Sequence, residues 1–236
     1  MASKSTVEEI RARFDADVER FSNLESGQSA TIDAPLVLEL VAHAAAATNP
    51  TATRALDVGC GAGNYALKLL EVIPELSFDL LDLSAPMLNR AAKRVTAVSG
   101  RQPRTIQADI REVELGEGAY DVITAAATLH HLRTDAEWEA VFAKFHRALR
   151  PGGSLWISDL VEHSIPAIHA LMRHRYGEYL QALKDASYRD HVFAYIDKED
   201  TPRPLLFQIE MLRKVGFGEV EILHKNSTFA AFGAVK

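Results

Sequence analysis

Apolar runs alternate with segments of helical periodicity along most of the chain. Between the runs, apolar residues recur every three or four positions, as on one side of a helix. Alternating strands and helices favour a sheet that helices cover on both faces. The pattern therefore predicts an α/β fold, with strands at 55–58, 76–81, 104–108, 120–126 and 154–160.

Other segments flank this alternating core. One apolar stripe of an amphipathic helix is predicted over residues 6–22, from Val7, Ile10, Phe14, Val18 and Phe21. A second helix is predicted at about 33–47, with Asp33 as its N-cap. The chain ends with a predicted helix at 205–215 and strand patterns at 219–224 and 228–235.

A glycine-rich turn joins the first strand to the following helix. Gly59, Gly61 and Gly63 carry no side chain, so the backbone can turn sharply and a ligand can approach it closely. A dinucleotide fingerprint would have its third glycine at position 64, where this chain has Asn64. Asp57 lies inside the strand, where a carboxylate suits an amino group better than a pyrophosphate. The turn predicts a ligand site.

The stretch from Asp57 to Gly63 reads acidic-x-Gly-x-Gly-x-Gly, which resembles motif I of the class I S-adenosyl-L-methionine (SAM)-dependent methyltransferases. The Leu-x-Pro-Gly-Gly turn at 149–153 is similar to the turn that precedes the fifth strand in that family. The resemblance is strong over about 50–160 and looser over 205–235. It implies a doubly wound, mostly parallel, seven-stranded Rossmann-like sheet and SAM as the cofactor.

Two acidic residues after predicted strands are candidates for holding the adenosine of SAM. Asp82 follows the second strand, about twenty residues beyond the glycine turn, and can accept hydrogen bonds from both ribose hydroxyls. By the resemblance, Asp109 accepts from the adenine amine. The resemblance also implies cofactor contacts from Leu83, Met87, Ile110 and Ala126, although Leu83 and Met87 fit a core position equally well.

The segment after the fourth strand, 127–132, passes beneath the methionine part of SAM in the family and faces the methyl acceptor. We expect His131 to line the acceptor pocket, where a neutral imidazole can accept a proton. His130 is expected to point elsewhere. Tyr176 and Arg175, on a helical pattern after the fifth strand, are expected to support His131. Alternatively the histidines only pack against the loop, and Tyr176 and Arg175 only cover apolar surface.

No metal site is predicted. His169 and His174 are five residues apart, which places them roughly 140° apart around a helix. The single cysteine, Cys60, cannot form an intramolecular disulfide and suits a reducing compartment. The N-terminus lacks the apolar stretch of a signal peptide, and no run reaches the ~18 apolar residues of a membrane span. We therefore expect a cytoplasmic protein that does not bind membranes.

The 236 residues fit one methyltransferase domain. Its parts are N-terminal helices (1–48), a SAM-binding core (50–160), a helical insertion (162–204) and a final helix with a hairpin (205–236). The insertion and the N-terminal helix are expected to close over the site as a lid, with Phe14, Asp15 or Phe21 over the ligand. Oligomeric state is left open.

The function expected is methyl transfer from SAM to a small-molecule acceptor. The formal net charge of −6 provides no general attraction for a nucleic acid. Two alternative functions remain open. A looser resemblance is to the tRNA-wobble-uridine carboxymethyltransferases, which use a carboxylated SAM. The other is a SAM-binding module without catalysis, in which the insertion serves a protein partner.

Overall fold

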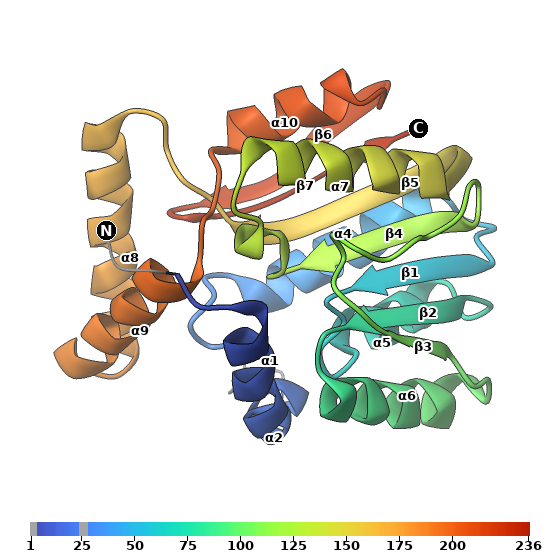
Figure 1. Ribbon diagram of the computed structural model, residues 1–236, viewed down its shortest axis with the longest axis horizontal. Coiled ribbons are helices and arrows are strands. Elements are labelled where there is room, and N and C mark those ends of the chain that lie inside the picture. The colour runs from blue at the N-terminus through green and yellow to red at the C-terminus, as the bar shows by residue number, and fades with distance from the viewer. Residues whose placement is uncertain (1–3, 24–27) are drawn as a thin grey trace.

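A seven-stranded sheet runs through the computed structural model, which describes residues 4–23 and 28–236 (Figure 1). Its strand order is β3-β2-β1-β4-β5-β7-β6. Strands β1 to β5 are mutually parallel, and β7 pairs antiparallel with both β5 and β6. The strands are β1 (Arg54–Val58), β2 (Ser77–Asp82), β3 (Arg104–Gln107), β4 (Tyr120–Ala126), β5 (Leu149–Leu160), β6 (Glu219–Asn226) and β7 (Phe229–Val235). The predicted doubly wound, mostly parallel sheet is confirmed.

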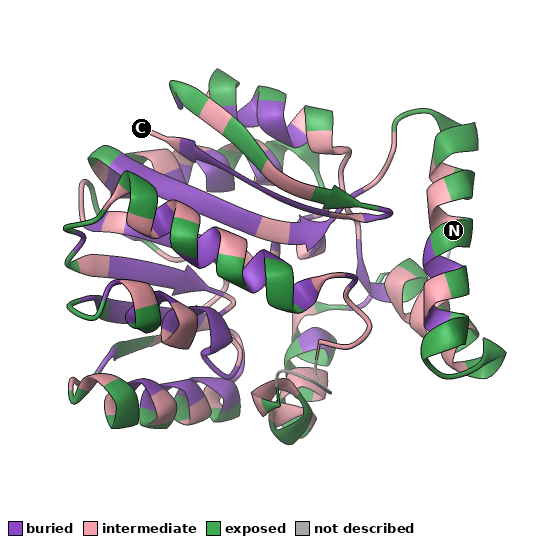
Figure 2. Ribbon diagram, turned by 180° about the vertical axis from the view of Figure 1, so that it is seen from behind, coloured by how far each residue is buried: buried purple, intermediate pink, exposed green. Residues whose placement is uncertain are grey.

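Helices cover both faces of the sheet, each with its own apolar cluster. One face packs against α4 (Ala34–Thr48), α5 (Asn64–Val72) and α6 (Ala85–Ser99). The other packs against α7 (Asp135–Ala148) and α10 (Leu205–Lys214). Figure 2 shows these helices buried on the side toward the sheet and exposed on the other, as their apolar periodicity predicts.

Four further helices lie beyond the carboxyl ends of the parallel strands (Figure 1). They are α1 (Val7–Ala16), α2 (Val18–Ser22), α8 (Pro166–Leu183) and α9 (Ala186–Glu199). The single helix expected over 6–22 is broken at Asp17, whose φ of −108° and ψ of 13° leave the helical region. Asp33 precedes α4 but makes no capping hydrogen bond, because its carboxylate contacts His224 and Asn226 instead.

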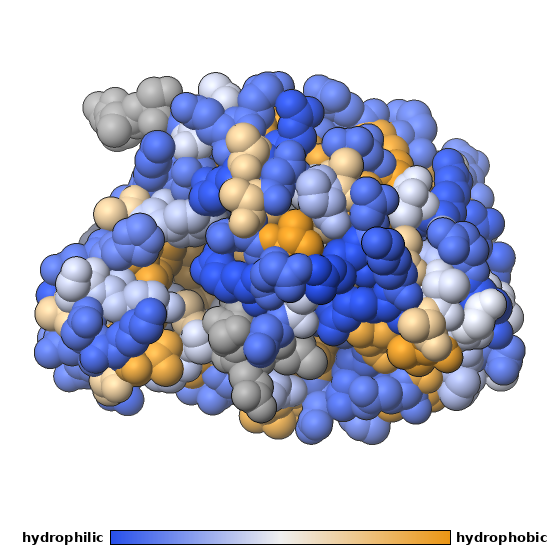
Figure 3. All heavy atoms as spheres, turned by 90° about the horizontal axis from the view of Figure 1, so that it is seen from below, coloured by the Kyte–Doolittle hydropathy of each residue, from blue (hydrophilic) through white to orange (hydrophobic). Residues whose placement is uncertain are grey.

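The surface around these helices is predominantly hydrophilic, with hydrophobic side chains in scattered patches (Figure 3). Among the described residues, no helix combines the length and the apolar character that crossing a membrane requires.

The pairing of β5 with β7 depends on a glycine under a tryptophan. Gly233 lies opposite Trp156, and a Cβ on Gly233 would stand 2.2 Å from the Trp156 ring and 2.3 Å from the carbonyl oxygen of Leu155. Trp156 cannot swing away freely, because its indole N–H donates to Ser154 Oγ at 2.9 Å. The register of the last strand therefore requires a residue without a side chain at 233.

Gly233→Ala is expected to lower the free energy of unfolding by about 1–3 kcal/mol or more, because overpacking forces the tryptophan or the strand to shift. Gly218→Ala is the matched control, since a Cβ there meets nothing within 4 Å. It should change stability by less than about 0.5 kcal/mol. Urea unfolding monitored by tryptophan fluorescence measures both, and equal stability of the two variants would contradict this account of the β5–β7 pairing.

Candidate active site

A cavity of about 1080 Å³ opens at the carboxyl ends of β1, β2, β4 and β5. The sheet order reverses between β1 and β4, and in open α/β sheets ligands bind at such a reversal. Residues of α1, α2, α8 and α9 complete the wall. The cavity thus lies between the predicted core and the two predicted lid segments.

Nine of the ten residues predicted to bind the cofactor line this cavity. They are Asp57, Gly59, Gly61, Asp82, Leu83, Met87, Asp109, Ile110 and Ala126. The tenth, Gly63, is not part of the lining. A Cβ on Gly63 would stand 3.1 Å from that of Ala91 in α6, so this glycine serves the close packing of α5 on α6.

The glycine turn is held in shape by Asp82. The N–H of Gly61 donates to Asp82 Oδ2 at 2.8 Å, and the N–H of Ser84 donates to Oδ1 at 2.8 Å. Burial raises the pKa of Asp82. Gly61 has φ +49°, and a Cβ there would meet nothing within 4 Å, so its backbone faces the open cavity. The Asp82 carboxylate and the Gly61 backbone, which carries no side chain, therefore border the same part of the cavity.

Asp57 is a buried carboxylate with an incomplete set of partners. Its Oδ1 accepts from the Thr124 hydroxyl at 2.9 Å, while Oδ2 has no hydrogen-bond partner among the described residues. Burial raises the pKa of Asp57 to about 7, against the lowering effect of Thr124. Buried carboxylates normally have all their partners. The free oxygen is therefore available to a cationic group of a ligand.

Asp109 is paired within its own loop. Arg111 holds the carboxylate through its guanidinium, with Nε donating to Oδ1 at 3.0 Å. Burial would raise the pKa of Asp109, but the hydrogen bonds from Arg111 outweigh it and lower that pKa. The adjacent Ile110 is buried at the cavity wall, as a residue packing on a ring would be.

The other side of the cavity contains a histidine pair on the short helix η1 (Leu129–His131). His130 was expected to point elsewhere, but it lies buried between two carboxylates. Its Nδ1 bonds to Asp159 at the end of β5, and its Nε2 lies 3.7 Å from Asp200 Oδ1. Burial alone would lower the pKa of His130, but Asp159 and Asp200 raise it to about 9.

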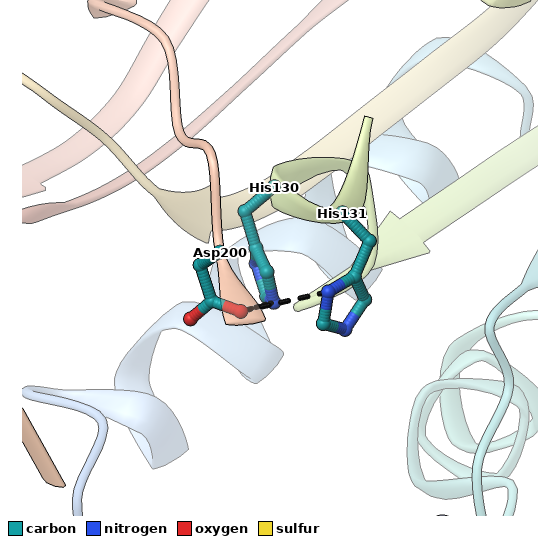
Figure 4. A group of neighbouring side chains, drawn as sticks. All are labelled: His130, His131 and Asp200. Atoms are coloured by element: carbon teal, nitrogen blue, oxygen red, sulfur yellow. Dashed lines mark ion pairs between the residues drawn. The ribbon is translucent and has the colours of Figure 1, made fainter. Parts of the chain in front are cut away.

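His131 lines the cavity, where it was predicted. Its Nδ1 lies 3.5 Å from Asp200 Oδ1, as Figure 4 shows, and its ring meets Phe14 of α1 edge to face. Neither ring nitrogen makes a hydrogen bond of normal geometry to the described residues. Burial, then the neighbouring His130 and Arg133, keep the pKa of His131 well below its usual value. His131 is therefore neutral, with a lone pair at the cavity wall.

The two predicted supporting residues on α8 point in different directions. Tyr176 lines the cavity, but its hydroxyl donates to the carbonyl of Ala30 at 3.0 Å and its ring packs on Phe193 and Phe229. Arg175 is exposed and outside the lining, because one helical step turns it about 100° from its neighbour. Tyr176 therefore positions α8, and Arg175 has no place in the site.

Two carboxylates of the site were missed. Asp159 stands near the carboxyl end of β5, so the argument used for Asp82 applies to it equally. Asp200 follows α9 in the strap, residues 200–204, and no spacing in the sequence relates it to the histidines. The N–H of Thr201 donates to the carbonyl of His130 at 2.7 Å and brings the strap to η1.

Known proteins resemble this chain in sequence. Residues 55–153 match the family model of a methyltransferase domain. The chain is 29% identical to the malonyl-[acyl-carrier protein] O-methyltransferase of Laribacter hongkongensis, across 81% of this chain and 60% of that protein. It is 26% identical to the carboxy-S-adenosyl-L-methionine synthase of Vibrio atlanticus, across 76% of this chain and 75% of that protein.

A solved structure agrees in fold. The 1,6-didemethyltoxoflavin-N1-methyltransferase of Burkholderia thailandensis, solved with 1,6-didemethyltoxoflavin and S-adenosylhomocysteine bound, superposes with a TM-score of 0.62 at 18% identity. The match covers 100% of this chain and 92% of that one. Identity this low shows the fold alone. The chain spans 60% of the length of the Laribacter relative, so activity and acceptor need their own argument.

Proposed function

We propose that this chain, whose residues 55–153 match the model of a methyltransferase domain, is a class I SAM-dependent methyltransferase that transfers the methyl group of SAM to a small-molecule acceptor. The observation that carries the proposal is the cavity, where the buried Asp57 and the partly buried Asp82 border the glycine turn on one side and the neutral His131 stands on the other. Single-ligand pockets span roughly 300–1,000 Å³. A cavity of about 1080 Å³ has room for a cofactor and a small acceptor together.

In this proposal, each part of SAM has a complementary group on the cofactor side. The free oxygen of Asp57 accepts from the ammonium group of the methionine part. Asp82 accepts from the ribose hydroxyls, and the loop of Asp109 and Ile110 borders the adenine. The Gly61 backbone supports close approach, because no side chain intervenes.

In this reaction, the protein mainly has to align the acceptor with the methyl group of SAM. A lone pair of the acceptor attacks the methyl carbon, the carbon–sulfur bond breaks, and its electron pair stays on sulfur as S-adenosylhomocysteine forms. Orientation can supply about 7–11 kcal/mol of barrier reduction in well-aligned cases. Residues of helices α1, α2, α8 and α9 line the cavity. We propose that these segments act as the lid and that His131 faces the acceptor.

Asp82→Asn is expected to weaken SAM binding about ten- to a hundredfold, since a hydrogen bond to a charged group contributes about 1.5–3 kcal/mol. Calorimetric titration measures the affinity. Asp79→Asn is the matched control, because Asp79 belongs to the same strand but contacts Arg54 and Tyr120 outside the cavity. If Asp82→Asn binds SAM like the parent, the ribose assignment is wrong; absence of SAM binding by the parent would refute the proposed function.

SAM binding should also depend on pH through Asp57. The ligand-free carboxyl has a pKa of about 7, and an ammonium group prefers its ionised form, so affinity should rise several-fold from pH 6 to 7.5. An α-amino group with a pKa of about 7.7–8.0 stays mostly protonated over that range. Asp57→Asn should bind more weakly and lose this dependence. Parallel pH profiles of parent and variant, measured by calorimetry, would speak against the assignment.

His131→Ala is expected to lower turnover by at least about tenfold with SAM affinity nearly unchanged, as for a residue on the acceptor side. Transfer of labelled methyl from SAM into a panel of small hydroxyl, amine and thiol compounds provides the assay. Arg175→Ala is the control on exposed α8 surface and should retain full turnover. Full turnover by His131→Ala would remove the histidine from the mechanism.

A further inference from the structure

We propose that His130, His131 and Asp200 bind a divalent transition-metal ion at the acceptor end of the cavity. This departs from the prediction of no metal, which rested on the spacing of His169 and His174 and on the resemblance to a family that does not need one. The three residues come from η1 and from the strap after α9, and Figure 4 shows their side chains converging. All three line the cavity.

The donor atoms are already close to metal-binding geometry. Asp200 Oδ1 lies 3.7 Å from His130 Nε2 and 3.5 Å from His131 Nδ1, and one donor atom from each residue lies within 4.8 Å of the others. Metal–ligand bonds of about 2.0–2.2 Å in a tetrahedron place neighbouring donors roughly 3.4 Å apart. The two contacts of Asp200 fit within a few tenths of an ångström.

Two of the donors are buried without a hydrogen-bond partner of their own. Among the described residues, neither His131 Nδ1 nor Asp200 Oδ1 makes a hydrogen bond, although Asp200 is only 5% exposed. Buried polar atoms are almost always satisfied, and unpaired ones are costly. A cation at the point where their lone pairs meet would satisfy both.

The residue that hydrogen-bonds to the second ring nitrogen of His130 is of the kind that orients a metal-bound histidine. His130 Nδ1 faces Asp159 Oδ1, which holds a proton on that nitrogen and leaves Nε2, directed toward Asp200, as the atom that would bind an ion in place of its proton. Asp159 is itself held rigidly, because its Oδ2 accepts from the N–H groups of Leu129 at 2.8 Å and His130 at 3.2 Å. This carboxylate–histidine pair orients the ligand before any ion arrives.

Charge and ligand type indicate which ion would bind. Asp159 and Asp200 place two carboxylates in a buried region, where a proton on His130 offsets part of their charge in the ion-free fold. A divalent cation that replaces that proton would balance both carboxylates. Imidazole ligands favour Zn²⁺ or a similar transition metal, whereas Mg²⁺ and Ca²⁺ prefer oxygen ligands. Three protein ligands also leave a coordination position toward the cavity, as in catalytic zinc sites.

The free coordination position of the ion could bind the methyl acceptor, an inference that rests on the proposed function. An oxygen or nitrogen donor of the acceptor could occupy it and be held next to the methyl group, with the ion acting as a template and Lewis acid. The ion would also add a link between the strap and η1, beside the hydrogen bond from Thr201 N–H to the His130 carbonyl and the contact of Arg133 with Thr201. Metal binding and lid position would then be coupled.

Zn²⁺ titration of the chelator-treated full-length chain tests the site by calorimetry, with Co²⁺ absorption reporting the coordination. We expect one ion per chain, bound at least about tenfold more weakly by His131→Gln and by Asp200→Asn. His174→Gln is the matched control, because His174 is exposed and pairs only with Glu178 among the described residues. It should bind the ion like the parent. Circular dichroism checks that each variant is folded.

The proposal is overturned if the folded parent binds no Zn²⁺ saturably, or if both site variants bind it as tightly as His174→Gln does. In those cases a shared proton, rather than a metal, links the histidines to Asp200. SAM titrations on the same metal-free samples separate this result from the proposed function. SAM binding without Zn²⁺ binding removes the metal site alone, whereas Zn²⁺ binding without SAM binding removes the methyltransferase proposal alone.

Discussion

The close contact between Gly59 and Thr128 governs the site. A Cβ on Gly59 would stand 2.0 Å from the Thr128 hydroxyl oxygen, so only glycine lets the turn after β1 meet the loop after β4. Gly59 has φ +63°, which glycine adopts at little cost. This contact lies where the sheet order reverses. It places the glycine turn and Asp82 on one side and the η1 histidines on the other side of the same cavity.

Several carboxyl groups of the cavity are removed from water by burial. Burial raises the pKa of Asp57, Asp82 and Asp200, which means that their ionised forms are costly in the ligand-free fold. A carboxyl whose pKa is raised by folding lowers stability as pH rises from its unfolded toward its folded pKa. Cationic groups would offset that cost on binding. The same carboxylates that reduce stability therefore favour ligands with positive charge.

Segments distant in sequence complete the acceptor end through a network of charged groups. Arg13 of α1 pairs with buried Glu199 at 2.9 Å and hydrogen-bonds to Tyr195, which joins the N-terminal helix to α9. Arg133, just after η1, donates to Thr201 Oγ1 at 2.9 Å and joins the core to the strap. These pairs are partly buried, so removing one partner would leave a charge poorly solvated. The segments proposed as a lid are thus held by specific contacts near the site.

Local patterns in the sequence determined the strands, most helices and the position of Asp82, because burial periodicity and turn chemistry act over a few residues. Ser84, for example, caps α6 by accepting from the N–H of Met87, as its position before Pro86 implies. Tertiary structure alone decided the break at Asp17 and the outward direction of Arg175. It alone brought Asp200 to His130 and His131, because that meeting depends on where a strap some seventy residues later in the chain packs.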